Sequence, residues 1–106
     1  MVDMDSVAEQ ARLFGVLASE LRLQLLAVLA EETVSAPELA DRPEFDVTAE
    51  TIHNNLKQLR EVGLVESERI YGPGNRPKDA FSLSADGFEL VLTVADEYSV
   101  SVTTLE

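Results

Sequence analysis

Residues 51–65 read TIHNNLKQLREVGLV, and the spacing of their apolar side chains predicts an amphipathic helix. Ile52, Leu56 and Leu59 follow one another at intervals of four and three residues, which places them on one face of an α-helix and predicts that this face is buried. The opposite face, projected at about 100° per residue, carries the polar side chains Glu50, His53, Asn54 and Lys57. Thr48 is expected to cap the start of this helix, and Gly63, which tolerates a left-handed conformation, to end it.

Three further helices are predicted upstream of this stretch. The first spans residues 6–18, and the second spans residues 20–32 with Ser19 as its cap. The third begins in the motif SAPEL at residues 35–39, where a serine and a glutamate three positions later form a capping box. A loop over residues 41–48 then leads into the long helix.

Downstream of the long helix the apolar period changes from helical to alternating. LVESERIY at 64–71 and KDAFSLS at 78–84 predict two strands around the turn GPGNRP at 72–77. A last helix is predicted to start at Ser82 or Ser84 and to span residues 84–100. Its apolar face would hold Phe88, Val91, Leu92, Ala95 and Tyr98. The β-branched end SVSVTTLE is weakly helical, so we expect it to fray or extend.

Composition limits the class of protein. A chain of 106 residues predicts one domain over 1–106, and the lack of cysteine excludes disulfides and thiolate metal sites. No apolar run approaches the roughly 18 residues that span a bilayer, and the N-terminus lacks the pattern of a signal peptide. We therefore expect a cytoplasmic protein. No nucleophile with a base, phosphate-binding loop or ligand cluster is recognisable, so an enzyme is not expected.

The charge is strongly negative but unevenly distributed. The chain holds 8 basic and 20 acidic residues, a net charge of −12. Residues 51–78 carry five of the cations and a balance of +2, whereas the rest of the chain has a balance of −14. An acidic coat with only two lysines suits a protein that works in concentrated salt. An ordinary acidic protein that repels nucleic acid has the same composition.

The order of elements is that of a winged helix-turn-helix: mainly α with a small β-hairpin wing, α-α-α-α-β-β-α. Residues 17–83 resemble the ArsR-type winged helix-turn-helix regulators in four phrases, LASELRLQLLAVL, SAPELAD, TIHNNLKQLREVGLVESER and DAFSLSADG. MarR-type and PadR-type families share some of these phrases. The resemblance implies a helix-turn-helix over 35–62 and a wing over 64–83.

The same resemblance implies which residues would bind double-stranded DNA. They are Thr48, Ala49, Glu50, His53, Asn54, Lys57 and Arg60 on the long helix, and Arg76 and Lys78 on the wing. Asn54 can pair with adenine through its amide, and Lys57 and Arg60 can bind phosphate or guanine. The wing tip, shaped by Gly72, Pro73, Gly74 and Pro77, can reach a minor groove. Each polar residue has the alternative of being a solvated side chain on a surface helix or turn.

In the resembled family the terminal helices form a two-fold dimer, here residues 6–18 and 84–100. The interface residues would be Phe14, Leu17, Phe88, Val91, Leu92, Ala95 and Tyr98. The alternative is that both helices only close over the core of one copy. Many family members sense metals through cysteines or histidines, but this chain has no Cys and one His. We therefore expect neither a metal site nor a cofactor.

Two functions follow as hypotheses. The first is a sequence-specific DNA-binding transcriptional regulator, a repressor rather than an activator, that acts as a homodimer at an operator in a salt-loving archaeon. The second is a winged-helix protein-interaction module that has lost DNA binding and docks a partner through its acidic surface. Glu50 on the long helix favours the second, because a carboxylate repels phosphates and accepts only from cytosine.

Overall fold

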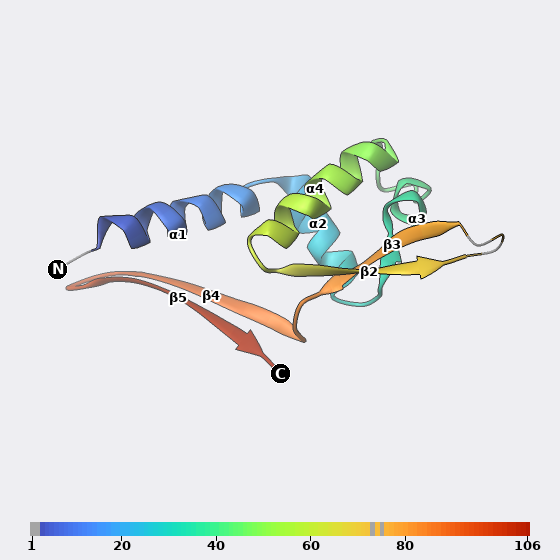
Figure 1. Cartoon of the computed structure of the whole chain (residues 1–106). Helices are drawn as coiled ribbons and strands as arrows, with labels where there is room; N and C mark the ends of the chain where they lie inside the picture. The colour runs from blue at the N-terminus through green and yellow to red at the C-terminus, as the bar shows by residue number, and fades with distance from the viewer. Residues whose placement is uncertain (1–2, 73, 75) are drawn as a thin grey trace.

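The computed structural model describes residues 3–72, 74 and 76–106. In these residues the elements follow in the order α1 (Met4–Leu17), α2 (Glu20–Leu29), β1 (Val34–Ser35), α3 (Ala36–Ala40), α4 (Ala49–Glu61), β2 (Val65–Tyr71), β3 (Pro77–Leu83), β4 (Gly87–Val94) and β5 (Tyr98–Leu105). Helices α2 to α4 and strands β1 to β3 make the body of the molecule, while α1 and the β4–β5 hairpin extend together to one side (Figure 1). The predicted turn residue Pro73 lies outside the described residues.

Three helices of the body begin at the polar caps that the sequence predicts. The side chains of Ser19, Ser35 and Thr48 accept hydrogen bonds from the backbone N–H groups three residues further on, at 3.3, 3.4 and 3.1 Å. Each bond satisfies an N–H group that has no partner within its own helix. Helix α1 begins two residues earlier than predicted, where Asp3 caps it.

The core of the body is built around α4. Ile52, Leu56 and Leu59 are 0% exposed, as the four-and-three spacing predicts. They pack with Leu25 from α2 and Phe81 from β3, which are also 0% exposed. The buried side of α4 therefore joins α2 and the sheet in one apolar cluster.

Gly63 ends α4 in a Schellman motif. Its φ angle is +85°, and its N–H group donates to the Arg60 carbonyl at 3.0 Å while the next N–H group, of Leu64, donates to the Leu59 carbonyl at 3.1 Å. Ser84, at the end of the wing, donates its hydroxyl to the Gly63 carbonyl at 2.6 Å. These bonds fix the angle between α4 and the wing.

The wing is a three-stranded sheet of order β1-β3-β2. Strands β2 and β3 form the predicted antiparallel hairpin, in which Val65 pairs with Leu83 and Tyr71 with Pro77. The short strand β1 was not predicted; it pairs Val34 with Phe81. A strand of two residues is too short to show an apolar period in the sequence. Its position is set by the packing of the core and not by its own sequence.

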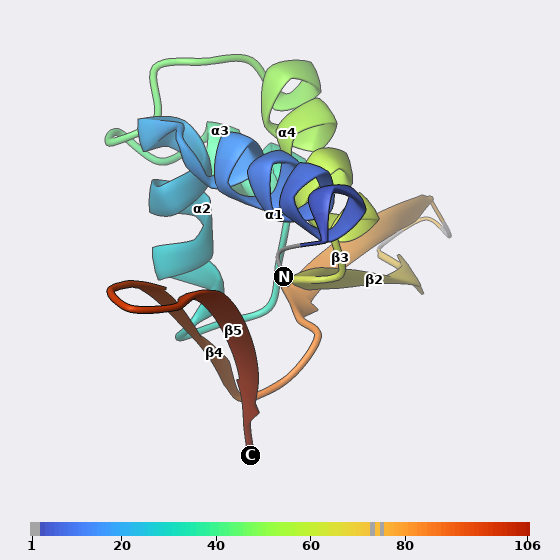
Figure 2. The ribbon, with the colours of Figure 1, turned by 90° about the vertical axis from the view of Figure 1, so that its left-hand side faces the viewer.

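The predicted last helix over 84–100 is wrong. Residues 87–105 form the antiparallel hairpin of β4 and β5, in which Gly87 pairs with Leu105 and Val94 with Tyr98. Figure 2 shows this hairpin beside α1 and separate from the wing. The elements therefore run α-α-β-α-α-β-β-β-β along the described chain, with a hairpin in place of the terminal helix.

The error has a physical cause in the spacing of the apolar residues. Phe88, Leu92 and Tyr98 are separated by even numbers of residues, so they share one face of a strand pair as well as one face of a helix. The β-branched residues that fill both strands favour the extended form. Val91 lies on the other face of the hairpin and Ala95 lies in its turn, so neither shares the predicted surface.

The hairpin has two unlike faces. The apolar hairpin face consists of Phe88, Leu90, Leu92, Val94, Tyr98, Val100, Val102 and Thr104. The polar hairpin face consists of Gly87, Glu89, Val91, Thr93, Ser99, Ser101, Thr103 and Leu105. This alternation is typical of a sheet with one face against protein and one face in water.

The two glycines Gly63 and Gly15 provide a test of the backbone. Replacing Gly63 with alanine should lower the free energy of unfolding by about 1–2 kcal/mol, because φ is positive there. Gly15→Ala should raise it by about 0.5–1 kcal/mol, because Gly15 lies within α1 and nothing would contact the added Cβ within 4 Å. Chemical denaturation of both variants measures this, and an equal effect of the two substitutions would contradict the helix end described above.

Candidate nucleic-acid interface

Helix α4 turns its polar face outward from the core. Glu50, Asn54 and Lys57 are exposed, and Thr48 and Ala49 lie at the start of the helix. Because the opposite stripe is fully buried, the helix cannot rotate without exposing its leucines. The exposed side chains of α4 are therefore held at fixed spacings on a rigid helix.

His53 and Arg60 lie at the edge of this surface, where α4 meets the wing. The His53 ring meets the Phe81 ring edge-on, with the centroids 5.7 Å apart and the planes at 75°. The Arg60 guanidinium lies 6.0 Å from the centroid of the same ring and donates to the Ser67 hydroxyl on β2 at 2.6 Å. Both side chains thus join α4 to the wing besides facing outward.

The two cations predicted for the wing tip differ in their surroundings. Arg76 is exposed just before β3. Lys78, on β3, donates to the Glu38 carboxylate of α3 at 2.8 Å, and both side chains stay partly exposed. The pair connects α3 to the wing. Its residues lie 40 positions apart, and the sequence pattern did not predict the contact.

The same contact changes the acidity of Glu38. The Lys78 ammonium holds the pKa of the Glu38 carboxyl below its usual value, and the hydroxyl of Ser35, which donates to it at 2.9 Å, lowers the pKa further. Ser35 is only 1% exposed. The carboxylate therefore stays ionised to a lower pH than an ordinary glutamate and holds the Lys78 ammonium beside α3.

Arg22 of α2 is a positioning residue that the sequence analysis missed. Its Nε donates to Asn55 Oδ1 at 2.9 Å, and its Nη2 donates to Gln58 Oε1 at 2.6 Å, both on α4. Its Nη1 donates to the Val16 carbonyl at 3.0 Å, at the end of α1. One guanidinium thus connects α1, α2 and α4. The phrase LASELRLQLLAVL contains this residue, but only the fold shows what it contacts.

The remaining ion pairs place acids around other parts of the molecule. Arg12 pairs with Glu61, Arg42 with Glu32 and Arg69 with Asp79. No ion pair among the described residues involves Lys57.

Among the described residues, no group of three or more His, Cys, Asp or Glu side chains is placed to hold a metal ion. No helix in this part of the chain is long and apolar enough to cross a membrane.

The Glu38–Lys78 pair predicts a pH dependence. Lys78→Met should raise the pKa of the Glu38 carboxyl towards its ordinary value, because the largest cause of the shift is removed. In the wild type, the pair stabilises the fold above the unfolded-state pKa and loses this effect as the pH falls through the lowered folded-state pKa. The carboxyl carbon shift of Glu38, followed by NMR against pH, measures this. Lys57→Met is the control and should leave the titration unchanged; an equal shift in both variants would contradict the pairing.

Sequence comparison relates part of the chain to a known family. Residues 17–68, from the end of α1 into β2, match the family model described as "Helix-turn-helix domain". No curated protein matches the sequence.

Structural comparison extends the relation to the fold. The crystal structure of Rv0081 from M. tuberculosis aligns with a TM-score of 0.63 at 24% identity, covering 80% of this chain and 77% of that chain. A solution structure from Mycobacterium bovis aligns with a TM-score of 0.63 at 24% identity, covering 81% of this chain and 78% of that chain. That protein, the fragment 1–100 of Mb0332, is described as a homodimeric winged helix-turn-helix DNA-binding domain and a possible ArsR-family transcriptional regulator. Residues 17–68 therefore match the helix-turn-helix family model, and the chain has the winged helix-turn-helix fold predicted from its resemblance to ArsR-type regulators.

Proposed function

We propose that this protein is a sequence-specific DNA-binding transcriptional regulator that acts as a homodimer and represses by occupying an operator. The helix-turn-helix family of residues 17–68 supports DNA binding. The observation that carries the proposal is the position of α4: its buried stripe and the Arg22 contacts hold Asn54 and Lys57 outward on a rigid helix. A helix held in this way can enter a major groove without rearrangement.

In this proposal the exposed residues of α4 have different roles. Asn54 reads adenine through its paired amide donor and acceptor. Lys57 neutralises a phosphate, and the first N–H groups of α4, beside Thr48 and Ala49, face a second phosphate. Glu50 accepts a hydrogen bond from cytosine or excludes other bases at its position.

The edge residues bind the backbone of DNA beside the groove. His53 and Arg60 are placed where α4 meets the wing, so they contact phosphates instead of base edges. Arg76 reaches the next minor groove. Lys78 leaves Glu38 and binds a phosphate. The exchange is open to it because the Lys78 side chain is partly exposed beside the carboxylate.

The homodimer follows from the way such domains read DNA. Two recognition helices related by a two-fold axis contact half-sites about one helical turn apart, so an inverted repeat is the expected operator. The homodimeric M. bovis domain with this fold supports the proposal. A dimer bound over a promoter excludes the transcription machinery, which gives repression.

The acidic composition suits a salt-loving archaeal host. Molar salt screens the repulsion between the coat, with its net charge of −12, and DNA. It also removes most of the affinity that counterion release supplies. Contacts to bases and to the shape of the groove must then contribute more of the affinity.

A protein-interaction module remains the second candidate. The exposed Glu50 on α4 and the −14 balance outside residues 51–78 favour it, because both repel phosphates. A module of this kind would bind a basic partner and enrich no DNA sequence.

Selection from a random pool of DNA duplexes, with the purified protein in molar KCl, tests the proposal. We expect recovery of an inverted repeat. Asn54→Ala should relax the preference at one position of each half-site, since a bidentate pair contributes about 1–3 kcal/mol of discrimination. Lys57→Ala should weaken binding to all sequences and reduce the salt slope by about one.

Gln24→Ala is the matched control, because Gln24 is an exposed polar residue of α2 outside this surface; it should bind like the wild type. Absence of enrichment with well-folded protein would contradict the regulator and favour the interaction module.

A further inference from the structure

A hollow of about 370 Å³, which we call the α2–hairpin cavity, lies between α2 and the base of the β4–β5 hairpin. Leu23 and Leu26 form its α2 side, and Phe88 and Leu90 form its β4 side. Leu64, which is only 4% exposed, lies where the cavity meets the core. Protein interiors leave few voids larger than a water molecule, whereas ligand sites measure about 300–1,000 Å³. The α2–hairpin cavity therefore has the size of a site for a small molecule.

The lining of the α2–hairpin cavity is apolar except at one point. Asp86, in the loop between β3 and β4, is the only residue with a polar side chain among the described residues that line it. Water in such a hollow finds few hydrogen-bond partners, and an apolar group that displaces it gains affinity. A cavity that holds one benzene ring measures about 150 Å³, so this one has room for about two rings. The size and the lining therefore favour a molecule with two apolar rings.

A polar hollow of about 240 Å³ adjoins the α2–hairpin cavity and shares Ala30, Leu83 and Asp86 with it. Glu31 and Glu32 also line this second hollow. Neither Asp86 nor Glu31 is in an ion pair among the described residues. Carboxylates gathered at one edge attract a cation. A molecule whose rings fill the apolar hollow is therefore expected to carry a positive charge at the end that reaches Asp86.

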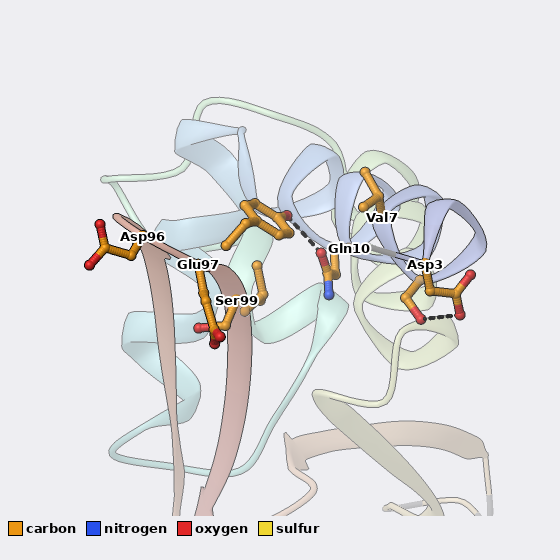
Figure 3. A pocket seen from close by; sticks show the side chains of 9 residues that line it. Asp3, Val7, Gln10, Asp96, Glu97 and Ser99 are labelled. Atoms are coloured by element: carbon orange, nitrogen blue, oxygen red, sulfur yellow. Dashed lines mark hydrogen bonds between the residues drawn. The ribbon is translucent and has the colours of Figure 1, made fainter. Parts of the chain in front are cut away.

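The cleft between α1 and the hairpin turn differs in its lining. Figure 3 shows Asp3 and Gln10 on the α1 side of this cleft, and Asp96 and Glu97 at the turn. It measures about 500 Å³, and Tyr98 donates its hydroxyl to Gln10 Oε1 at 2.7 Å. Polar groups of this kind hold water, and apolar rings that displaced it would lose its hydrogen bonds. This cleft is therefore not expected to bind an apolar molecule.

The position of the α2–hairpin cavity gives a bound molecule a structural effect. Strands β4 and β5 contact mainly each other, and a two-stranded hairpin without cover is marginally stable in water. Phe88 of β4 packs against the core and also lines the cavity. A molecule held between Phe88 and Leu26 would add contacts between the hairpin and α2. It would therefore stabilise the hairpin against opening.

We propose that the α2–hairpin cavity binds a small aromatic amine, with its rings against Leu26, Leu64 and Leu83 and its ammonium group beside Asp86. The site lies apart from the exposed face of α4, so this inference does not rest on the proposed function. None of the measurements below uses DNA, and their failure would leave DNA binding by α4 untouched.

Methyl chemical shifts of the full chain, labelled with ¹³C at leucine and valine and titrated with naphthylmethylamine in molar KCl, test the site. We expect saturable shifts at Leu26, Leu64 and Leu83. The roughly twelve non-hydrogen atoms of the probe imply a dissociation constant on the order of 1 mM or below. Leu92 and Val94 are the control, because at 55% and 74% exposed they report general attachment to apolar surface. Shifts that do not saturate, or that are as large at Leu92 and Val94, overturn the proposal.

The charge of the probe tests the role of Asp86. Naphthylmethylamine, naphthylmethanol and naphthoate carry the same rings with a positive, a neutral and a negative group. In about 0.2 M KCl the amine should bind about two- to fivefold more tightly than the alcohol, as expected for an exposed ion pair, and naphthoate should bind most weakly. Asp86→Asn should abolish the preference for the amine. Asp96→Asn is the matched control, because it removes the same charge from the cleft in Figure 3, and it should keep the preference.

Equal affinity of the three probes for the wild type would contradict the ammonium site, as would an unchanged preference in Asp86→Asn. The methyl spectrum of each variant shows at the same time that it is folded.

Amide hydrogen exchange tests the contact with the hairpin separately. At a naphthylmethylamine concentration of about ten times its dissociation constant, exchange of the β4 and β5 amides should slow by about tenfold, because opening of the hairpin releases the probe. Unchanged exchange in these strands at saturation overturns binding between α2 and the hairpin.

Discussion

The burial of one side of α4 in the core sets how the helices and the wing are arranged around it. Ile52, Leu56 and Leu59 are fully enclosed by α2, α3 and the wing, so the orientation of the helix is set by the core. The Schellman motif at Gly63 fixes where the wing leaves the helix. The hydrogen bonds of Arg22 hold α4 against α2. A surface that must match the spacing of bases needs this rigidity, because each loose side chain would have to be ordered on binding.

The uneven distribution of charge along the chain follows the elements of the fold. The stretch with a positive balance, residues 51–78, folds into α4 and the wing. Two acids close to this surface are paired with cations, Glu38 with Lys78 and Asp79 with Arg69, whereas Glu50 on α4 is in no ion pair among the described residues. These pairs keep Lys78 and Arg69 positioned while partly neutralising the carboxylates. The protein can thus be acidic as a whole and still offer cations at one surface, although in concentrated salt such pairs contribute little to stability.

The body of the fold could be predicted from the sequence, because its signals are local and agree with one another. The caps at Ser19, Ser35 and Thr48, the apolar period of α4 and the glycine at its end all point to one arrangement. The C-terminal element could not be predicted in the same way, because Phe88, Leu92 and Tyr98 fit a helix and a strand pair equally. The contacts of Arg22, Glu38 and Lys78 join residues far apart in the sequence, so no local pattern contains them. The roles of Asn54 and Lys57 in DNA binding remain predictions.

Amide chemical shifts of the ¹⁵N-labelled protein, recorded in molar KCl while a duplex with its selected sequence is added, show directly which surface binds DNA. If α4 and the wing bind DNA, the largest changes should fall on α4 around Asn54 and Lys57 and on the wing around Arg76, with the polar hairpin face unchanged. Changes confined to the acidic surface or to the β4–β5 hairpin, with α4 unaffected, would contradict DNA recognition by α4.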